Sequence, residues 1–257
     1  MSSKKYENNR LVIYQVCRYT YFVSTLYIVG TPIGNLGDIT FRAVETLKNA
    51  DVIACEDTRH TLELLTHFEI RKPLISCRAQ NEESAARKII GLLKGGQTVA
   101  YASDAGTPGI SDPGAVLAEL VRKEGYPVVP VPGPSAFATL VSVAGAGGKT
   151  LVFEGFLSPS PGKRRRRLKE LIETGYAFVL YESPFRIVKL LTDLADIDGE
   201  RRVVVGRELT KLHEEIVDGS AADVRDDFSA RESIKGEFAV FVSGVKRIQL
   251  SDESTDN

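Results

Sequence analysis

The sequence has few of the residues that build disulfides and metal sites, and it has no long apolar run. Its three cysteines, Cys17, Cys55 and Cys77, are odd in number and form no Cys-x-x-Cys pair, which argues against a disulfide framework and against a zinc site. The three histidines show no metal-ligand spacing either. No stretch of about 20 uncharged apolar residues occurs, so the sequence predicts no membrane span. We therefore expect a cytoplasmic protein that binds neither a metal nor a membrane.

An excess of charge of one sign is also missing. The formal net charge is -1, so any binding of a polyanion would need a local basic patch. Such a patch is present as five consecutive cations, Lys163, Arg164, Arg165, Arg166 and Arg167. A charge run commonly lies on a solvated helix face, but cations near a helix N-terminus oppose its dipole, at a cost of up to about several tenths of a kcal/mol each. Because an external anion would offset that cost, we predict that this run contacts phosphate groups.

A long glycine-rich loop, Ala102–Gly114 (A-S-D-A-G-T-P-G-I-S-D-P-G), is the segment around which the chain is organised. It follows an apolar, β-branched run and precedes an amphipathic run, which predicts a strand, a loop and a helix. Asp112 and Pro113 suit the start of that helix. The loop is roughly twice the median length of about 4 to 6 residues for such connections. Asp104 also lies where open α/β sheets bind ligands, so the loop predicts a binding site.

Short apolar strands alternate with helical patterns along the whole chain, which predicts an α/β fold. The expected strands are Thr25–Val29, Val52–Cys55, Leu74–Ser76, Thr98–Ala102, Val128–Val131, Leu151–Phe153, Ala177–Tyr181, Arg202–Gly206 and Glu237–Ser243. Because strands separated by helices pair in parallel, we expect two sheets, each mostly parallel or mixed and flanked by helices. The Gly/Pro loops that follow the strands should then lie on one rim.

The length and the composition fit two domains of about 120 residues each. We expect an N-terminal extension (residues 1–24), an N-terminal domain carrying the Gly/Pro loops (25–145), a C-terminal domain (146–246) and a disordered tail (247–257). The glycine-rich segment Ala144–Lys149 would join the two domains.

The second strand runs directly into Glu56-Asp57-Thr58-Arg59-His60. An acidic residue about 20 residues after a glycine loop is where a dinucleotide-binding fold holds the ribose. The loop from Gly30 to Gly37, however, is not G-x-G-x-x-G and has Pro32 in its middle. The pattern therefore matches a Rossmann dehydrogenase only weakly.

Eight segments, in unbroken order over about residues 26 to 245, together resemble one family. They are Thr31–Thr40 (T-P-I-G-N-L-x-D-I-T), Glu56–Thr61 (E-D-T-R-H-T), Ser103–Gly114 (S-D-A-G-T-P-x-I-S-D-P-G), Val131–Ala136 (V-P-G-P-S-A), Glu154–Leu157 (E-G-F-L), Tyr181–Arg186 (Y-E-S-P-x-R), Arg207–Lys211 (R-E-L-T-K) and Lys235–Phe238 (K-G-E-F). The chain resembles the 16S rRNA ribose methyltransferases of the tetrapyrrole methylase superfamily.

This resemblance implies a class III methyltransferase that uses S-adenosyl-L-methionine to methylate the 2'-hydroxyl of a cytidine in the decoding region of 16S rRNA, within the small ribosomal subunit. It also implies a homodimer of two-domain subunits with the cofactor between the domains, and it assigns RNA binding to the run from Lys163 to Arg167. The implied cofactor-binding residues are Pro32, Ser103, Asp104, Ala105, Gly106, Pro134, Ser135, Ala136, Tyr181, Arg207, Glu208, Leu209 and Phe238. The chain departs from the family where Arg78 and Gln80 stand in place of two histidines.

The chemistry of ribose methylation suggests catalytic roles. Since a ribose hydroxyl is a poor nucleophile and the donor methyl is already activated, the protein must mainly align the reacting atoms. A positioned base would add about 10² to 10⁴-fold, and Glu56, Asp57 and Glu182 are the candidates, with Arg59 holding a phosphate. Two other classes stay open: a tetrapyrrole (precorrin-type) C-methyltransferase with the same fold and cofactor, and a non-enzymatic ribosome-assembly factor.

Overall fold

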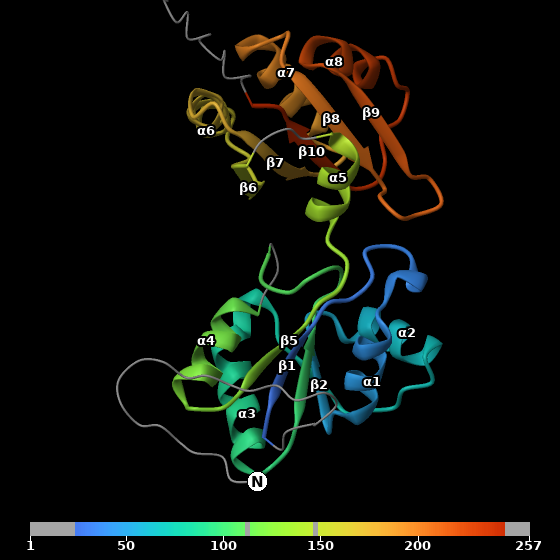
Figure 1. The fold of residues 1–257 in the computed structure, drawn as a ribbon, viewed down its shortest axis with the longest axis vertical. Coiled ribbons are helices and arrows are strands. Elements are labelled where there is room, and N and C mark those ends of the chain that lie inside the picture. The colour runs from blue at the N-terminus through green and yellow to red at the C-terminus, as the bar shows by residue number, and fades with distance from the viewer. Residues whose placement is uncertain (1–23, 111–113, 146–148, 245–257) are drawn as a thin grey trace, which may run out of the picture. The chain divides into compact units, whose positions relative to one another are not determined.

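A computed structural model describes residues 24–110, 114–145 and 149–244 (Figure 1). The chain divides into two compact units. The first unit comprises the segments up to Val29, Phe41–Asp104 and Pro113–Val131, and the second comprises Gly30–Thr40, Ala105–Asp112 and the chain from Pro132 onward. The expectations for the extension 1–24, the helix start at Asp112 and Pro113, the joint at 146–148 and the tail 247–257 lie outside the described residues, apart from Ser24.

The first unit contains a five-stranded sheet in the order β3-β2-β4-β1-β5, and all its strand pairs are parallel. Its strands are β1 (Leu26–Val29), β2 (Val52–Cys55), β3 (Leu74–Ser76), β4 (Val99–Ala102) and β5 (Val128–Val131). Of the three inner strands, β2 and β4 are apolar and buried at every position, because helices cover both faces of a parallel sheet. Cys55 and Cys77 are buried free thiols in this core.

Four helices flank this sheet: α1 (Phe41–Asn49), α2 (Thr58–His67), α3 (Glu82–Lys94) and α4 (Ala115–Lys123). In Figure 1, α1 and α2 lie on one side of the strands, and α3 and α4 on the other. The side chain of Glu82 joins α3 to the start of α4, where its Oε1 accepts from the backbone N–H groups of Gly114 (2.8 Å) and Leu117 (3.0 Å). A carboxylate from another helix therefore caps α4.

The second unit contains a mixed five-stranded sheet in the order β6-β7-β10-β8-β9. Its strands are β6 (Leu151–Phe156), β7 (Ala177–Glu182), β8 (Arg202–Arg207), β9 (Glu215–Ser220) and β10 (Phe238–Val242). β6 and β7 are parallel, whereas β10 is antiparallel to both β7 and β8, and β9 is antiparallel to β8. The expected α/β class with mostly parallel or mixed sheets is confirmed. The edge strand β9 was not predicted, because its sequence E-I-V-D-G-S is mostly polar and only partly buried.

Helices cover both faces of the second sheet. One core joins it to α6 (Pro161–Glu173), α7 (Ile187–Ile197) and α8 (Ala221–Ser229). The other joins it to α5 (Ala136–Ala144), whose Leu140 and Ala144 pack against Val179, Val204 and Phe241. The expected domain boundary at residues 145 and 146 falls after α5, whereas the compact units divide before it, because the apolar face of α5 is buried on the second sheet.

Within the described residues, no helix has the length and hydropathy needed to cross a membrane. The same part of the chain contains no group of three or more His, Cys, Asp or Glu side chains placed to hold a metal ion.

Candidate functional site

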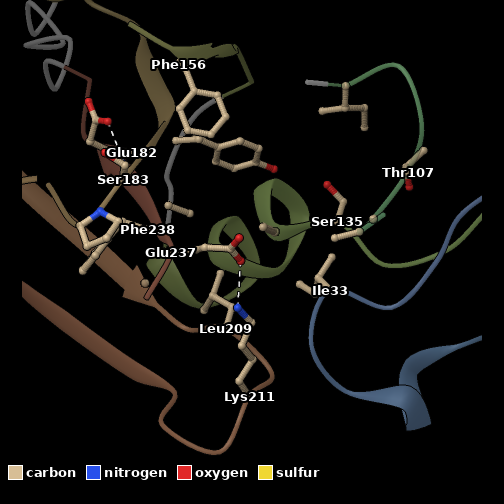
Figure 2. A pocket seen from close by; sticks show the side chains of 18 residues that line it. Ile33, Thr107, Ser135, Phe156, Glu182, Ser183, Leu209, Lys211, Glu237 and Phe238 are labelled. Carbon is tan, nitrogen blue, oxygen red and sulfur yellow. Dashed lines mark hydrogen bonds and ion pairs between the residues drawn. The ribbon is translucent and has the colours of Figure 1, made fainter. Parts of the chain in front are cut away.

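A cavity of about 390 Å³ lies within the second unit (Figure 2), a size in the range of small-molecule sites. Its walls come from the loops after β1, β4 and β5, from the ends of β6, β7, β8 and β10, and from the segments that follow β7 and β8. The lining residues are Ile33, Ala105, Gly106, Thr107, Ile110, Ser135, Ala136, Phe156, Tyr181, Glu182, Ser183, Pro184, Gly206, Leu209, Lys211, Glu237, Phe238 and Ala239. Most of this lining is apolar.

Three glycine- and proline-rich loops form one wall, and hydrogen bonds between them hold them together. Thr31 and Gly106 exchange two backbone hydrogen bonds, of 2.9 and 3.1 Å, and the Thr107 hydroxyl donates to the carbonyl of Pro134 (3.1 Å). Gly106 has φ +83°, and a Cβ there would come within 3.3 Å of the Ile33 side chain. Only glycine combines that backbone angle with such a close approach, so the loop presents bare backbone to the cavity.

The facing wall is built from the sheet and α5. The Tyr181 hydroxyl accepts a hydrogen bond from the backbone N–H of Phe137 at 2.9 Å, which ties β7 to the first turn of α5. This bond satisfies one of the N–H groups that a helix N-terminus leaves without an internal partner. Ser135, the residue before the helix, makes no side-chain capping bond. Ser135, Ala136 and Tyr181, which the resemblance assigns to cofactor binding, line the cavity.

The segment after β8 (R-E-L-T-K) carries a charged network at the cavity. Lys211 Nζ lies 2.9 Å from Oε1 of Glu208 and 2.9 Å from Oε2 of Glu237 (Figure 2 shows the contact with Glu237). Burial alone would raise the pKa of Glu208, but the hydrogen bonds from Lys211 and the Glu237 backbone hold it below its usual value. Glu208 and Thr210 have positive φ angles, of 49° and 68°, which cost non-glycine residues energy. This strained turn places Leu209 and Lys211 in the cavity wall.

Part of the residues expected to bind the cofactor line this cavity, and their binding role stays a prediction. The predicted cofactor residues that line the cavity are Ala105, Gly106, Ser135, Ala136, Tyr181, Leu209 and Phe238. Those outside the lining are Pro32, Ser103, Asp104, Pro134, Arg207 and Glu208. Arg207 and Glu208 are both held in ion pairs, Arg207 with Glu215 and Glu208 with Lys211.

Arg207 is directed to the strand β9. Its Nε donates to Oε2 of Glu215 at 2.9 Å, and Glu215 also receives two hydrogen bonds of 2.8 Å from Arg231. The hydrogen bonds from Arg231 are the main reason why the pKa of Glu215 lies below its usual value. Arg207 therefore joins an ion-pair cluster outside the cavity lining, and its cofactor-binding role stays a prediction.

Glu182 lines the cavity, but its carboxylate is fully buried and already paired. Its Oε1 accepts from Arg186 Nε (2.7 Å) and from the backbone N–H of Ser183 (2.8 Å). In Figure 2 the carboxylate lies at the margin of the lining set, beside Ser183. An oxygen held by a guanidinium is a poor proton acceptor, so the geometry favours a structural role over the predicted role as a base.

The other catalytic candidates lie in the first unit, after β2. Asp57 caps α2, because its Oδ1 accepts from the backbone N–H of Arg59 at 2.9 Å. That hydrogen bond is the main reason why the pKa of Asp57 lies below its usual value. The backbone N–H of Asp57 in turn donates to Oδ1 of Asp104 (2.9 Å). Glu56 is half-buried, and the Arg59 side chain is 87% exposed.

The basic run begins at the third residue of α6, which starts at Pro161, whereas the sequence predicted a helix from Arg164 to Glu173. Arg164 is buried and donates to Asp193 (2.6 Å), and Arg165 bridges Asp193 and Asp196 at 2.8 Å each. Carboxylates from a neighbouring helix therefore supply the anions that the dipole argument assigned to an external phosphate. Two of the five predicted RNA contacts are thus largely committed inside the protein.

The remaining cations of the run differ in exposure. Arg167 makes a two-pronged pair with Glu154 (2.7 and 2.8 Å). Arg166 has a side chain that is 75% exposed and lies 3.9 Å from Glu170, and Lys163 is exposed. The predicted RNA contact is therefore best served by Lys163 and Arg166.

Several lining residues were not predicted as site residues, although they belong to the segments that carry the resemblance. Phe156 belongs to E-G-F-L, and Ser183 and Pro184 belong to Y-E-S-P. Each lies at or directly after the end of a strand, and this position could have indicated a place in the site. Thr107 and Ile110 lie in the loop Ala102–Gly114, and the sequence did not distinguish them from the other residues of that loop as lining residues.

The chain forms two α/β units, and Gly/Pro loops of the second unit line a mostly apolar cavity. A sequence profile of the Tetrapyrrole (Corrin/Porphyrin) Methylases matches residues 25–225, and the chain belongs to this family.

Relatives within the family share one name. The Ribosomal RNA small subunit methyltransferase I of Borrelia garinii subsp. bavariensis is 47% identical over 219 residues, which cover 85% of this chain and 98% of the relative. The protein of the same name from Thermotoga maritima is 46% identical over 219 residues, with the same coverage of 85% and 98%.

Solved structures agree on the fold. A cobalt precorrin-4 methyltransferase of cobalamin biosynthesis has a TM-score of 0.63 at 18% identity and covers 86% of this chain and 95% of its own. A uroporphyrin-III-C-methyltransferase from Thermus thermophilus has a TM-score of 0.60 at 17% identity, over 86% and 94%. At such low identity, these likenesses establish the fold alone.

Proposed function

We propose that this protein is an S-adenosyl-L-methionine-dependent methyltransferase of small-subunit ribosomal RNA, and that it methylates the ribose 2'-hydroxyl of a cytidine in the decoding region. The observation that carries the proposal is the 46 to 47% identity to two relatives named Ribosomal RNA small subunit methyltransferase I. The matches cover nearly the whole length of these relatives. A ribosomal substrate also implies that the protein acts in the cytoplasm. The homodimer expected from the resemblance is part of the same proposal.

The cavity fits the proposed cofactor. Its volume of about 390 Å³ lies in the range for small-molecule sites, and the bare backbone at Gly106 lets a ligand approach closely. The apolar side chains of Ile33, Leu209 and Phe238 suit a ligand with a flat ring, and the Ser135 hydroxyl can hydrogen-bond it. When bound, the cofactor supplies an activated methyl group on a sulfonium.

The residues of this chain contribute mainly alignment. The loop bonds between Thr31 and Gly106 and the tie between Tyr181 and Phe137 hold two walls of the cavity in place before any ligand binds. A preformed site avoids much of the entropy cost of ordering, and alignment of this kind can supply several kcal/mol of a transfer barrier, on the order of 7 to 11 in the best cases. No metal is required for such a transfer.

Proton removal from the ribose hydroxyl is assigned to Glu56. Glu182 is buried against Arg186, and Asp57 is committed to capping α2 with a lowered pKa, so neither is a suitable base. Glu56 is half-buried at the carboxyl end of β2, where parallel sheets gather their functional groups. Arg59 follows Glu56 by three residues and has a highly exposed side chain. We assign it to a phosphate of the RNA.

The deciding experiment is transfer of labelled methyl from S-adenosyl-L-methionine to 30S subunits that lack the modification, with the product nucleoside identified by mass spectrometry. We expect 2'-O-methylcytidine. Cofactor binding without RNA methylation, together with methylation of a precorrin-type substrate, would support the tetrapyrrole alternative. Binding to 30S subunits without cofactor binding would support an assembly factor.

A further inference from the structure

Phe156, the last residue of β6, is an exposed aromatic residue at the cavity. Its ring lines the cavity (Figure 2), and the residue is 57% exposed. An apolar ring gains by leaving water, so a large aromatic side chain left open beside a binding cavity is a candidate contact surface for a ligand. No cofactor-binding or catalytic role was assigned to it from the sequence.

A β-bulge aims this ring at the cavity. In the pairing of β6 with β7, Phe153 is opposite Val179, but Gly155 is opposite the next residue, Leu180, so Glu154 is an extra residue in β6. Without the extra residue, the alternation of side chains would turn the ring of Phe156 to the opposite face of the sheet. With it, Phe156 is opposite Tyr181 and shares its face.

Two further features fix the bulge. Gly155 has φ +71°, an angle that glycine adopts at little cost. The extra residue Glu154 receives two hydrogen bonds from Arg167, of 2.7 and 2.8 Å, and this pairing raises the pKa of the guanidinium further. The next residue, Leu157, is buried in the core on the other face of the sheet, which also fixes the shifted register.

The orientation of the ring is set by a chain of aromatic contacts. Phe156 packs edge to face on Tyr181, with ring centres 5.7 Å apart. Tyr181 packs in the same way on Phe153 (5.1 Å), and Phe153 on Phe137 (5.1 Å). Because the Tyr181 hydroxyl also accepts from the Phe137 backbone, the chain is closed by a hydrogen bond. The Phe156 ring is thus held by neighbours at one side while more than half of the residue remains open to solvent.

We infer that the open face of Phe156 stacks on the base of the RNA nucleotide that receives the methyl group. The inference rests on the proposed function and identifies the group that positions its substrate. Proteins that recognise single-stranded or looped RNA commonly splay a base out and hold it against an aromatic side chain, which replaces the lost stacking. A preset, exposed ring at the cavity meets that need.

The first test compares Phe156→Ala with wild type. We expect kcat/KM for unmethylated 30S subunits to fall by about 10- to 100-fold, which corresponds to the loss of one base-stacking contact. The dissociation constant of S-adenosyl-L-methionine, measured by calorimetry, should change by less than about 2-fold. Phe156→Tyr should restore kcat/KM, because it keeps a flat ring. Phe185→Ala is the matched control: Phe185 is 87% exposed, belongs to the same unit and does not line the cavity.

The second test removes the base. Small subunits are reassembled with an abasic residue at the methylated position, which keeps the ribose hydroxyl. Wild type should lose about 10- to 100-fold in kcat/KM on this substrate, while Phe156→Ala should be nearly insensitive to the change. Equal sensitivity of both proteins would overturn the inference, and so would an unaltered kcat/KM of Phe156→Ala. A parallel loss of cofactor affinity would also overturn it, by assigning the ring to the cofactor. If wild type transferred no methyl group to 30S subunits under any condition, the proposed function itself would fail and the inference with it.

Discussion

Arg186 and Glu182 form an ion pair at the base of the segment that follows β7. A terminal nitrogen of Arg186 lies 2.6 Å from Oε1 of Glu182, whose side chain is inaccessible to solvent, and Nε lies 2.7 Å from the same oxygen. Within the described residues Oε2 has no hydrogen-bond partner. Since the guanidinium provides most of the compensation for this buried charge, the pair fixes the turn that carries Ser183 and Pro184 into the cavity wall.

Replacement of Arg186 by leucine should therefore destabilise the protein by about 3 to 5 kcal/mol, because it leaves a buried carboxylate without its partner. Chemical denaturation of the purified variant measures this loss. Glu182→Gln should lower stability less, since the amide removes the buried charge. If Glu182 were the catalytic base instead, Glu182→Gln would abolish turnover without a loss of stability, which would contradict the structural role.

The two halves of the basic run should respond differently to substitution. Arg164→Leu leaves Asp193 buried without its closest partner, so we expect a loss of stability of about 3 to 5 kcal/mol. Lys163→Ala and Arg166→Ala remove exposed charges, so stability should change by less than about 0.5 kcal/mol.

RNA binding gives the complementary readout. If Lys163 and Arg166 each contact a phosphate, each alanine variant should reduce the slope of log affinity for 30S subunits against log salt by about 1. The control is Arg225→Ala, a partly buried arginine of α8 in the same unit, which is paired with Asp226. An unchanged salt slope in both α6 variants would remove the run from the RNA-binding surface.

The basic run shows where the sequence was informative and where it was not. The run was correctly placed near a helix N-terminus, because a Pro-Gly pair precedes it. Its partners could not be predicted, since Asp193 and Asp196 lie about 30 positions away in the chain. The sequence shows unpaired cations, whereas folding brings carboxylates to them.

The strands were predictable for a different reason. β2, β3 and β5 were located to the residue, because short apolar runs bounded by polar or turn residues have few alternatives. β9 was missed, since an edge strand that is half exposed has no continuous apolar pattern. The bulge in β6 could not be predicted either, because E-G-F-L can continue the strand with or without a bulge. Only the pairing with β7 shows that Glu154 is the extra residue.

Acid should weaken the cluster around Glu215. Its folded-state pKa lies below the usual value of about 4.3, mainly because of the hydrogen bonds from Arg231. A depressed pKa means that the carboxylate stabilises the fold above the unfolded value, and that this stabilisation is lost as the pH falls through the folded value. The difference in melting temperature between wild type and Glu215→Gln should therefore be constant from pH 8 to about 6 and shrink below about 4. A difference that stays constant down to pH 3 would contradict the assignment.

The assignment of the base to Glu56 makes a prediction that separates it from its neighbour. Glu56→Gln should lower kcat by about 10² to 10⁴-fold, because the amide cannot accept the proton of the ribose hydroxyl, while cofactor affinity and melting temperature stay near those of wild type. Asp57→Asn should retain most of kcat, because asparagine also caps helices well, and should lose only the charge at the start of α2.

Single-turnover methylation of 30S subunits at saturating cofactor measures the chemical step for both variants. Substrate binding and product release do not limit such a measurement, so a loss seen there belongs to the transfer itself. A wild-type rate for Glu56→Gln would exclude Glu56 as the base. The rate would then depend on alignment alone, since Asp57 is held by the N–H of Arg59 and Glu182 by Arg186.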